Sequence, residues 1–470
     1  MKNSKIDNLN GIKKIHFIGI GGSGMFPLAQ ILKQNGFEVT GSDVYESDTL
    51  EKVKKLGIKV NLSQEKENIS DQDLVVFSAA IKETNPEICA AKEKNIPIIE
   101  RSVMLGIIFN KYKNSVGIAG THGKTTTTSM ITTVLLDAGK SPTAVIGGML
   151  PKLGSNAAAG NSDIIVAEAC EYVDSFLCLN PRISVITNVD ADHLDYFKTF
   201  ENVKKSFNKF ANQTSDLVVL NGDDKGALDS TKNIKAKKVT FGFSDNCDYC
   251  AKNIKFDEKQ FSTFDIYKNG KKIAEISLSV PGNHNIYDSL AAFIVCEYLG
   301  VLPEDIASSL KNFSGAHRRF EILANIGGIT VIDDFAHHPA ELETTLLAAS
   351  KMGFKRVWAI FQPHTYSRTA MLLDDFAKAL SIPEKAIISE ILPVRETNTY
   401  GIHSEDLVKK IPGAVYIPTF EEITDYIIKN ASNGDLIITM GGGNIYKCAG
   451  EIVKKLKEKN NWNIFKIAIS

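Results

Sequence analysis

Short apolar runs alternate with stretches of helical periodicity along most of the chain. The first cycle contains the runs KIHFIGI, FEVTGSD, DLVVFSAA and IPIIE, with a helical pattern from Met25 to Asn35 between the first two. A second cycle begins at SVGIAG and continues with DIIVAEA, ISVITNV and SDLVVLNG, and a third contains GITVIDDF, RVWAIFQ, AIISEI and DLIITMG. Buried strands that alternate with helices are typical of parallel sheets covered by helices. The pattern therefore predicts an α/β protein built from three sheet-and-helix units.

The segment from about Lys237 to Pro281 has a different pattern. Its runs are amphipathic, and Asn269-Gly270 is a dipeptide that favours the tight turn of a β-hairpin. We expect an antiparallel insertion here, followed by a helix from about Ile286 to Leu299. With boundaries near 106 and 318, the predicted domains comprise residues 1–106, 107–318 and 319–470.

Charge and composition narrow the class of protein. The 470 residues include 54 Lys and Arg against 55 Asp and Glu, so the formal charge of −1 gives no general attraction to nucleic acid or to an anionic membrane. A polar N-terminus and the lack of an apolar run of about 20 residues predict a cytoplasmic protein without membrane spans. The seven scattered cysteines favour reduced thiols, and the CxxC pair of Cys247 and Cys250 is better interpreted as a loop or strand edge than as a metal site.

A glycine-rich turn, GIGGSG, follows the first predicted strand and opens a helix. Glycines allow a ligand to approach the backbone, and a helix N-terminus offers free N–H groups to an anion. Asp43 closes the next strand, where dinucleotide folds place an acid that binds ribose, about 20 residues after the turn. The turn alone favours NAD, although it suits any nucleotide diphosphate, and a purely structural tight turn is the alternative. The residues expected at this ligand are Gly19, Gly21, Gly22, Ser23, Gly24 and Asp43.

A second glycine-rich loop, GTHGKTTT, follows the buried run SVGIAG and precedes another helix. Backbone amides of such a loop surround phosphate, Lys124 supplies a positive charge for the β- and γ-phosphates, and the Thr125 hydroxyl is suited to Mg²⁺. The general phosphate-loop spacing requires glycine at position 118, which is Ile118 here. The loop is therefore a variant of that pattern.

Two residues at the ends of neighbouring strands are suited to a metal ion near this loop. Glu168 ends the run DIIVAEA, and His193 lies in DADHLD, just after ISVITNV. Strand ends of a doubly wound sheet open on one crevice, so both side chains are predicted to share it with Thr125. Glu171 is a weaker candidate, with a solvated position as the alternative.

The third unit contributes two polar clusters. Arg319 lies in HRRFE and Asp334 in DDFAHHP, and an arginine delivered from a neighbouring domain would stabilise a migrating phosphoryl group. An exposed ion-pair patch is the alternative for the arginine pair. The loop FQPHTYSRT, with His364 and Arg368, follows the strand RVWAIF at the end where substrates usually bind.

Seven motifs in order make the chain resemble the Mur ligases, ATP-dependent enzymes that add amino acids to the cell-wall precursor. These motifs are IHFIGIGGSGM, GTHGKTTT, EACEY with TNVDADHLDYF, PGNHN, GAHRRFE, DDFAHHP and FQPHTYSRT. The resemblance covers nearly the whole chain. It implies a Rossmann-like N-terminal domain, a central P-loop ATPase-like α/β domain with the antiparallel insertion, and a Rossmann-like C-terminal domain.

The resemblance also implies a reaction. The first domain would hold UDP-N-acetylmuramate, so the first turn would bind the diphosphate of UDP rather than NAD. The lactyl carboxylate would be phosphorylated by ATP and then attacked by L-alanine, releasing ADP and phosphate. Shielding the acyl phosphate from water requires domain closure. His337, His338 and His364 are open choices for the base that deprotonates the incoming amine.

The roles implied by the resemblance fall into four sets. The ATP site comprises Gly120, Thr121, His122, Gly123, Lys124, Thr125, Thr126, His284, Asn285, Arg319 and Asp334. The metal site, expected to hold Mg²⁺, comprises Thr125, Glu168 and His193. His364 and Arg368 would receive the amino acid, and Lys124, His193 and Arg319 would act in catalysis. A monomer or homodimer is expected.

Several positions depart from the family pattern. An apolar residue near Phe207 stands where sister ligases use a carbamylated lysine, and Asp288 and Asn444 replace residues that are commonly Asn and Asp. Four alternatives stay open: a murein peptide ligase that attaches a tripeptide, an NAD-dependent dehydrogenase, a kinase, and an inactive nucleotide-binding regulator. The dehydrogenase would leave Lys124, Glu168 and His193 without a role.

Overall fold

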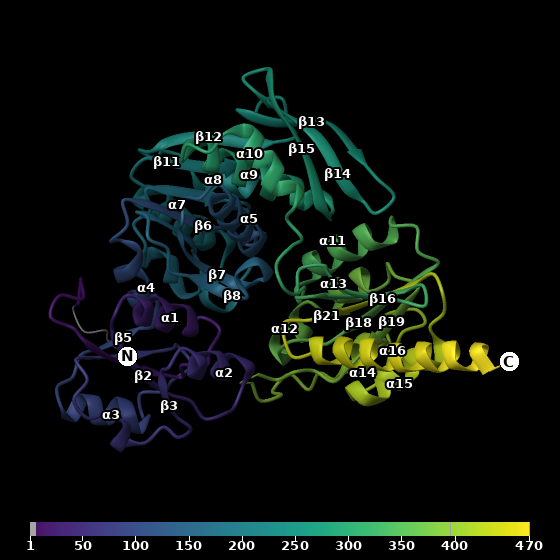
Figure 1. Ribbon diagram of the computed structural model, residues 1–470, viewed down its shortest axis with the longest axis horizontal. Coiled ribbons are helices and arrows are strands. Elements are labelled where there is room, and N and C mark those ends of the chain that lie inside the picture. Colours follow the sequence, from purple (N-terminus) through teal and green to yellow (C-terminus); the bar gives the residue numbers. More distant parts are fainter. Residues whose placement is uncertain (1–5, 395, 470) are drawn as a thin grey trace. The chain divides into compact units, whose positions relative to one another are not determined.

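The computed structural model describes residues 6–394 and 396–469 and divides into two compact units (Figure 1). The first comprises the chain up to Ile254 together with Phe264–Ser277 and His284–Phe313. The second comprises Lys255–Thr263, Leu278–Asn283 and the chain from Ser314 onward. Each contains α/β sheets, as the alternation of apolar runs predicts. Among the described residues, no helix is long and apolar enough to cross a membrane.

The N-terminal part of the first unit is a five-stranded parallel sheet of order β3-β2-β1-β4-β5. Its strands are β1 (Lys14–Ile18), β2 (Glu38–Ser42), β3 (Lys59–Asn61), β4 (Leu74–Phe77) and β5 (Ile98–Glu100). Its helices are α1 (Phe26–Gln34), α2 (Asp48–Lys55), η1 (Lys66–Asn68), α3 (Pro86–Glu93) and α4 (Arg101–Phe109). The central strand β1 is buried on both faces because helices cover the sheet, which explains its continuous apolar run.

A ten-stranded sheet follows, of order β15-β14-β13-β12-β11-β10-β6-β9-β7-β8. Its strands are β6 (Asn114–Ala119), β7 (Thr143–Leu150), β8 (Ser155–Ala158), β9 (Ile164–Glu168), β10 (Ile183–Ile186), β11 (Leu217–Asn221), β12 (Lys237–Gly242), β13 (Tyr249–Phe256), β14 (Phe261–Lys268) and β15 (Lys271–Pro281). Its helices are α5 (Lys124–Asp137), η2 (Pro151–Leu153), η3 (Tyr172–Cys178), α6 (Leu194–Phe197), α7 (Phe200–Gln213), α8 (Lys225–Ser230), α9 (Asn283–Tyr298) and α10 (Pro303–Lys311).

The predicted antiparallel insertion is partly wrong at its start. Strand β12 pairs in parallel with β11, in the register Leu217 to Lys237, and the start of β13 pairs in parallel with β12, so both continue the central sheet. The first residues of β12 are exposed, which gives a parallel strand the amphipathic pattern of an edge. The predicted hairpin is confirmed: Asn269 and Gly270 join β14 to β15 with φ values of 49° and 76°, as a tight two-residue turn requires.

The second unit contains a six-stranded sheet of order β16-β17-β21-β18-β19-β20, antiparallel only at β16. Its strands are β16 (Glu321–Ile326), β17 (Ile329–Asp334), β18 (Arg356–Phe361), β19 (Lys385–Ile388), β20 (Val415–Tyr416) and β21 (Asp435–Met440). Its helices are α11 (Pro339–Ser350), α12 (Tyr366–Met371), α13 (Leu373–Ala379), α14 (Ser404–Val408), α15 (Phe420–Asn430) and α16 (Tyr446–Ile469). Apolar side chains of α11, α13 and α14 cover one face, and those of α15 and α16 cover the other.

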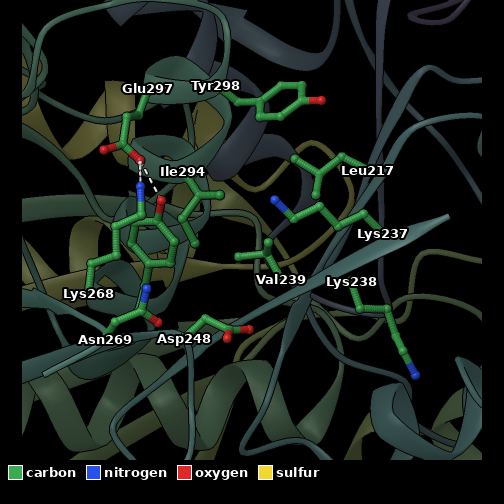
Figure 2. A pocket seen from close by; sticks show the side chains of 11 residues that line it. Leu217, Lys237, Lys238, Val239, Asp248, Lys268, Asn269, Ile294, Glu297 and Tyr298 are labelled. Atoms are coloured by element: carbon green, nitrogen blue, oxygen red, sulfur yellow. Dashed lines mark hydrogen bonds and ion pairs between the residues drawn. The ribbon is translucent and has the colours of Figure 1, made fainter.

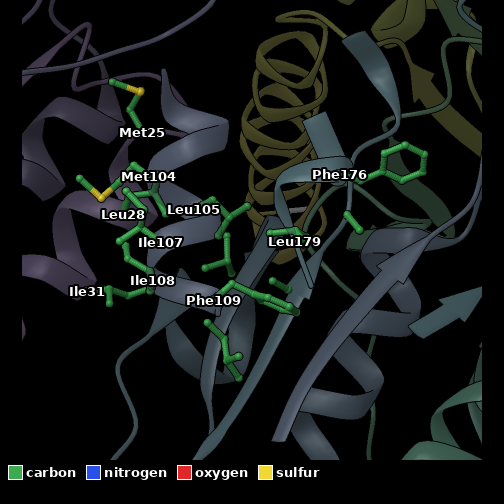
Figure 3. Close-up of a cluster of buried hydrophobic side chains, with 14 of the residues drawn as sticks. Met25, Leu28, Ile31, Met104, Leu105, Ile107, Ile108, Phe109, Phe176 and Leu179 are labelled. Atoms are coloured by element: carbon green, nitrogen blue, oxygen red, sulfur yellow. The ribbon is translucent and has the colours of Figure 1, made fainter. Parts of the chain in front are cut away.

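Helix α4 joins the two sheets of the first unit through one continuous core. Met25, the residue before α1, and Leu28 of α1 belong to the same buried cluster as Met104 and Leu105 of α4, and the cluster extends to Phe176 beside the second sheet (Figure 3). A Cβ at Gly106 would lie 2.5 Å from the carbonyl oxygen of Cys178, so only glycine permits this close packing. The predicted boundary at 106 falls inside α4, and both boundaries stay predictions.

Candidate active site

The first glycine-rich turn lies between β1 and α1, as predicted. Gly19 has a φ of 78°, and its N–H and that of Ile20 donate to the carbonyl oxygen of Ser42 at the end of β2. Asp43 accepts a hydrogen bond from the N–H of Gly21 at 2.9 Å through Oδ2. A Cβ at Gly21 would lie 2.9 Å from that oxygen. The acid predicted at ribose therefore also holds the turn in shape.

The second glycine-rich loop joins β6 to α5 and requires both of its glycines. Gly120 has a φ of 143°, and a Cβ there would lie 1.9 Å from Oγ1 of Thr187. Gly123 has a φ of 84°, and a Cβ there would lie 2.6 Å from Oδ1 of Asp288. No larger residue fits these positions without a backbone shift.

The segment after β10 holds this loop in place. The N–H of His122 donates to Oδ1 of Asn188 at 2.8 Å, and Asn188 Nδ2 donates back to the carbonyl oxygen of His122 at 3.1 Å. The N–H of Asp190 donates to Oγ1 of Thr121 at 2.9 Å. Since β6 and β10 are neighbours in the sheet, the loop is fixed before any ligand arrives.

Lys124 is paired with Glu171 beneath the loop. Its Nζ lies 3.0 Å from Oε2 of Glu171 and also donates to the carbonyl oxygens of Gly120 and Thr121. Burial alone would lower the pKa of Lys124, but the charge and hydrogen bond of Glu171, together with the nearby Cys170 and Glu168, leave that pKa raised. Glu171 is only 2% exposed, so it is a buried ion-pair partner rather than a solvated surface residue. Sequence spacing gave no indication of this contact.

The three residues predicted for a metal ion lie at the starts or ends of strands and helices of the central domain. Thr125 lies in the first turn of α5, Glu168 ends β9 beside Ile118 of β6, and His193 precedes α6 with a φ of 53°. Oε1 of Glu168 accepts from the N–H of Gly147 at 2.6 Å, and the His193 ring lies 4.7 Å from that of Tyr172. Among the described residues, no three His, Cys, Asp or Glu side chains form a metal cluster. One carboxylate with a hydroxyl and an imidazole fits Mg²⁺, which usually takes its remaining ligands from phosphates and water.

The start of α9 lies against the second loop. Asp288 accepts from the Thr127 hydroxyl at 2.8 Å through Oδ1 and contacts Gly123 as described. Asp288, the residue that departs from the family pattern, therefore packs against the second loop and the helix that follows it. Asn285 is buried, and its Nδ2 lies 3.2 Å from Nε2 of the exposed His284 ring. Their predicted contacts with adenine stay predictions.

In the second unit, the two neighbouring arginines have different surroundings. Arg318 is 8% exposed and donates to Oδ2 of Asp333 at 2.7 Å and to the carbonyl oxygens of Gly441 and Gly443. Arg319 is partly exposed, and its guanidinium lies 5.2 Å from the centre of the Phe335 ring. The Arg318 guanidinium is therefore used in hydrogen bonds that stabilise the fold, and Arg319 is the arginine available to a ligand.

Asp334 holds the segment that carries Arg319. Its two carboxylate oxygens accept from the N–H groups of Phe320 and Ala336, each at 2.7 Å. Burial raises the pKa of Asp334 to about 6, against the opposing charge of Arg319. These bonds show how Asp334 orders the turn, and its predicted contact with nucleotide stays a prediction.

His337, His364 and Arg368 lie together at the carboxyl ends of β17 and β18. The centres of the His337 and His364 rings are 5.8 Å apart, and Nδ1 of His364 lies 3.4 Å from Nη1 of Arg368. Burial lowers the pKa of His364 to about 4, helped by the nearby His337 and Arg368. Burial also lowers the pKa of His337. Both rings are therefore neutral at pH 7, and His364 is a weak base.

A separate cavity of about 550 Å³ lies at the starts of β11 and β12 (Figure 2). Its lining includes Lys268, whose Nζ lies 3.0 Å from Oε2 of Glu297, an acceptor also for the Tyr249 hydroxyl. The second loop follows the opposite end of β6, so this cavity is distinct from the predicted nucleotide site. Cys247 and Cys250 are buried, with burial raising the pKa of Cys247 to about 12.

Two glycine-rich turns at the ends of parallel strands, one carrying a phosphate-type lysine, define a nucleotide-binding α/β protein. Three family models match the chain: Mur ligase family, catalytic domain at residues 14–113; Mur ligase middle domain at 118–296; and Mur ligase, glutamate ligase domain at 318–443. The chain therefore belongs to the Mur ligase family, and both the resemblance and the predicted fold class are confirmed.

Two curated relatives and one solved structure that match over nearly the full chain are named for the same pair of substrates. UDP-N-acetylmuramate–L-alanine ligase of Caldanaerobacter subterraneus subsp. tengcongensis is 46% identical over 459 residues, which is 96% of this chain and 99% of that protein. The ligase of the same name from Acetivibrio thermocellus is 46% identical, covering 97% and 99%. The crystal structure of UDP-N-acetylmuramate-alanine ligase MurC from Thermotoga maritima aligns with a TM-score of 0.82 at 30% identity, covering 95% and 99%.

Proposed function

We propose that this protein is an ATP-dependent ligase that joins L-alanine to the lactyl carboxylate of UDP-N-acetylmuramate, giving ADP and phosphate. The observation that carries the proposal is the 46% identity, over 96% of the chain, to a ligase named for these substrates. The complete second loop, with its partly buried lysine, supports the use of ATP. A carboxylate is a poor acyl donor in water, so a phosphorylated intermediate is needed before an amine attacks.

The first unit would bind and activate the substrates. Amides of the second loop and Lys124 would hold the β- and γ-phosphates, in place of the present contact with Glu171. The first turn would bind the diphosphate of the UDP-sugar. Thr125, Glu168 and His193 would hold Mg²⁺, which when bound neutralises charge on the transferring phosphate. The oxygen-rich donor set supports this choice of metal.

The second unit would supply the remaining contacts. Arg319, the available arginine of its pair, would meet the migrating phosphoryl group. His364 and Arg368 would receive L-alanine, with the guanidinium suited to its carboxylate. Because His364 is neutral and weakly basic, we assign it a binding contact rather than the removal of a proton from the amine.

The proposal includes a role in peptidoglycan precursor synthesis and hence in cell division, and a cytoplasmic location. Seven free cysteines are consistent with a reducing compartment. A monomer or homodimer is expected.

The test is phosphate release from ATP with UDP-N-acetylmuramate and Mg²⁺, measured across amino acids and a cell-wall tripeptide. We expect release that depends on L-alanine, with a product heavier by one alanine residue. Phosphate release that occurs with the tripeptide and not with L-alanine would identify a peptide ligase. Phosphate release without any amine acceptor would identify a kinase. Discrimination against glycine and serine is expected to be modest, about 1–3 kcal/mol, because each differs from alanine by one small group.

A further inference from the structure

Glu396 joins the segment after β19 to the loop that carries the predicted amino-acid site. Its Oε2 accepts a hydrogen bond from the N–H of Ser367 at 2.8 Å, and its Oε1 accepts one from the Ser367 hydroxyl. Ser367 is the second residue of α12 and lies between His364 and Arg368 in sequence. One residue of the predicted site therefore engages both oxygens of a carboxylate that comes from 29 positions further along the chain.

The backbones of the two segments are also paired, and both are strained. The N–H of Thr365 donates to the carbonyl oxygen of Leu392 at 2.9 Å. Thr365 has a φ of 69°, and Val394 has a φ of 57°. Such values are unfavourable for β-branched residues and persist only where surrounding contacts enforce them. Glu396, two residues after the second strained position, supplies such a contact through Ser367, two residues after the first.

The guanidinium of Arg368 is available to a ligand. Its Nη1 lies 3.4 Å from Nδ1 of His364, and no ion pair within residues 6–394 and 396–469 includes it. Glu396 is close by, since burial lowers the pKa of His364 and the negative charge of Glu396 opposes that shift. Its oxygens nevertheless bind Ser367 rather than the guanidinium. Arg368 thus keeps the fork of donors that binds a carboxylate through two hydrogen bonds.

The chemistry of the incoming amine argues against its direct contact with Glu396. L-alanine arrives mainly as an ammonium ion and must lose a proton before it attacks. A carboxylate in contact with the ammonium would favour the charged form and so oppose the attack. A carboxylate whose two oxygens are held by Ser367 instead fixes the position of the loop.

We propose that Glu396 is a positioning residue of the amino-acid site, holding Ser367 so that α12 presents Arg368 to the carboxylate of the amino acid. The inference rests on the proposed function for the identity of the amino acid, while the bond between the two segments rests on the contacts above. Loss of this bond would let α12 turn and misplace the guanidinium. The affinity for the amino acid would fall, and the affinities for the two nucleotides would not.

Phosphate release at varied L-alanine concentration tests this role in the full-length protein. Glu396→Ala should raise the KM for L-alanine roughly 10- to 100-fold, because a misplaced guanidinium forms weaker charge-assisted hydrogen bonds. The kcat and the KM values for ATP and UDP-N-acetylmuramate should stay within about threefold, whereas a merely destabilised protein would lose kcat with an unchanged KM for L-alanine. Glu396→Gln keeps hydrogen-bonding groups for Ser367 without the charge and should raise that KM by no more than about threefold.

Glu422→Ala is the matched control in the same sheet. Oε2 of Glu422 also accepts from the N–H and the hydroxyl of one residue, Thr419, at 3.3 and 2.7 Å, but at the start of α15. Its loss should leave the KM for L-alanine unchanged. Hydrogen exchange of residues 363–372 reports the bond of Glu396 without any substrate. It should be faster in Glu396→Ala and unchanged in Glu422→Ala.

Three results would overturn the inference. Unchanged exchange in Glu396→Ala would show that the bond does not hold the loop, and faster exchange with an unchanged KM for L-alanine would show that it serves the fold alone. An equal rise of this KM in Glu396→Gln and Glu396→Ala would assign the carboxylate charge to the amine instead. Failure of the proposed function is a different result, in which the unchanged protein releases no phosphate with L-alanine while the exchange rates still differ between the variants.

Discussion

The ammonium of Lys124 lies 3.0 Å from the carboxylate of Glu171, in a pair whose side chains are 17% and 3% exposed. This contact places the lysine at the base of the second loop with its charge already balanced. A triphosphate that binds the loop would compete with Glu171 for the same ammonium. The pair therefore sets both the stability of the ligand-free loop and the response to ATP.

Lys124→Met should abolish ATP turnover, with a loss of roughly 100-fold or more, because the phosphates lose a positive charge in a partly buried site. The measurement is ADP formation at saturating UDP-N-acetylmuramate and L-alanine. Lys225→Met, at the exposed start of α8, is the control and should leave the rate unchanged. Near-normal turnover in a folded Lys124→Met protein would contradict the assignment of the loop.

Glu171→Gln should destabilise the ligand-free protein by about 3 kcal/mol, because it leaves a largely buried ammonium without its counter-charge. Saturating ATP should recover part of this loss, since its phosphates supply the missing negative charge. Denaturant unfolding with and without ATP measures both effects. A loss of stability that ATP leaves unaltered would show that Lys124 does not meet the phosphates.

Arg318→Ala and Arg319→Ala should separate stability from activity. Removing Arg318 leaves Asp333 buried without its partner and should cost about 3 kcal/mol or more of unfolding free energy. Removing the partly exposed Arg319 should change stability by only about 0.5 kcal/mol. It should nevertheless lower kcat roughly 100-fold, because a charge that meets the phosphoryl group is lost. Melting curves measure the stability and initial rates measure the activity. A large loss of stability in Arg319→Ala, with a large loss of kcat in a stable Arg318→Ala protein, would exchange the roles of the two residues.

His364 should make stability depend on pH. Its pKa is about 4 in the folded protein, so the unfolded chain, with a pKa of 6.5, binds the proton more readily between these values. This contribution to stability should therefore be nearly complete above about pH 6.5 and fall by about 3 kcal/mol as the pH drops to 4. His364→Gln should remove this contribution.

The measurement for His364 is the difference in unfolding free energy between the two proteins at pH 7, 6, 5 and 4. Asp334 contributes equally to both proteins, so its effect on stability, which has the opposite direction over part of this range because its pKa is raised, cancels in the difference. A difference that is constant with pH would show that the ring is not held neutral by burial.

The sequence predicted the parallel sheets because their strands are apolar on both faces and end in glycine turns. It misplaced β12, since Lys237 and Lys238 are exposed and give a parallel strand an edge-like pattern. The glycine loops were found because their backbone geometry demands glycine at fixed positions. Glu171 received little weight, since its partner lies 47 positions away and no local pattern encodes that contact.

Two other features also depended on tertiary contacts. Adjacent arginines are equivalent in sequence, and only the carbonyl oxygens of Gly441 and Gly443 distinguish Arg318 from Arg319. Arg101 belongs to no motif, and its side chain reaches Gly24 of the first turn from the start of α4, the helix that follows β5. Local patterns thus identify loops, whereas the charges that complete them come from distant segments.

The central claim is that two glycine-rich turns in one unit bind two different nucleotides at the same time. Calorimetry with a non-hydrolysable ATP analogue and UDP-N-acetylmuramate tests this most directly. We predict that each binds at one site per chain in the presence of the other, that Lys124→Met weakens only the ATP analogue, and that Gly24→Val weakens only the UDP-sugar. Mutual displacement of the two ligands, or binding of NAD in place of the UDP-sugar, would contradict the account.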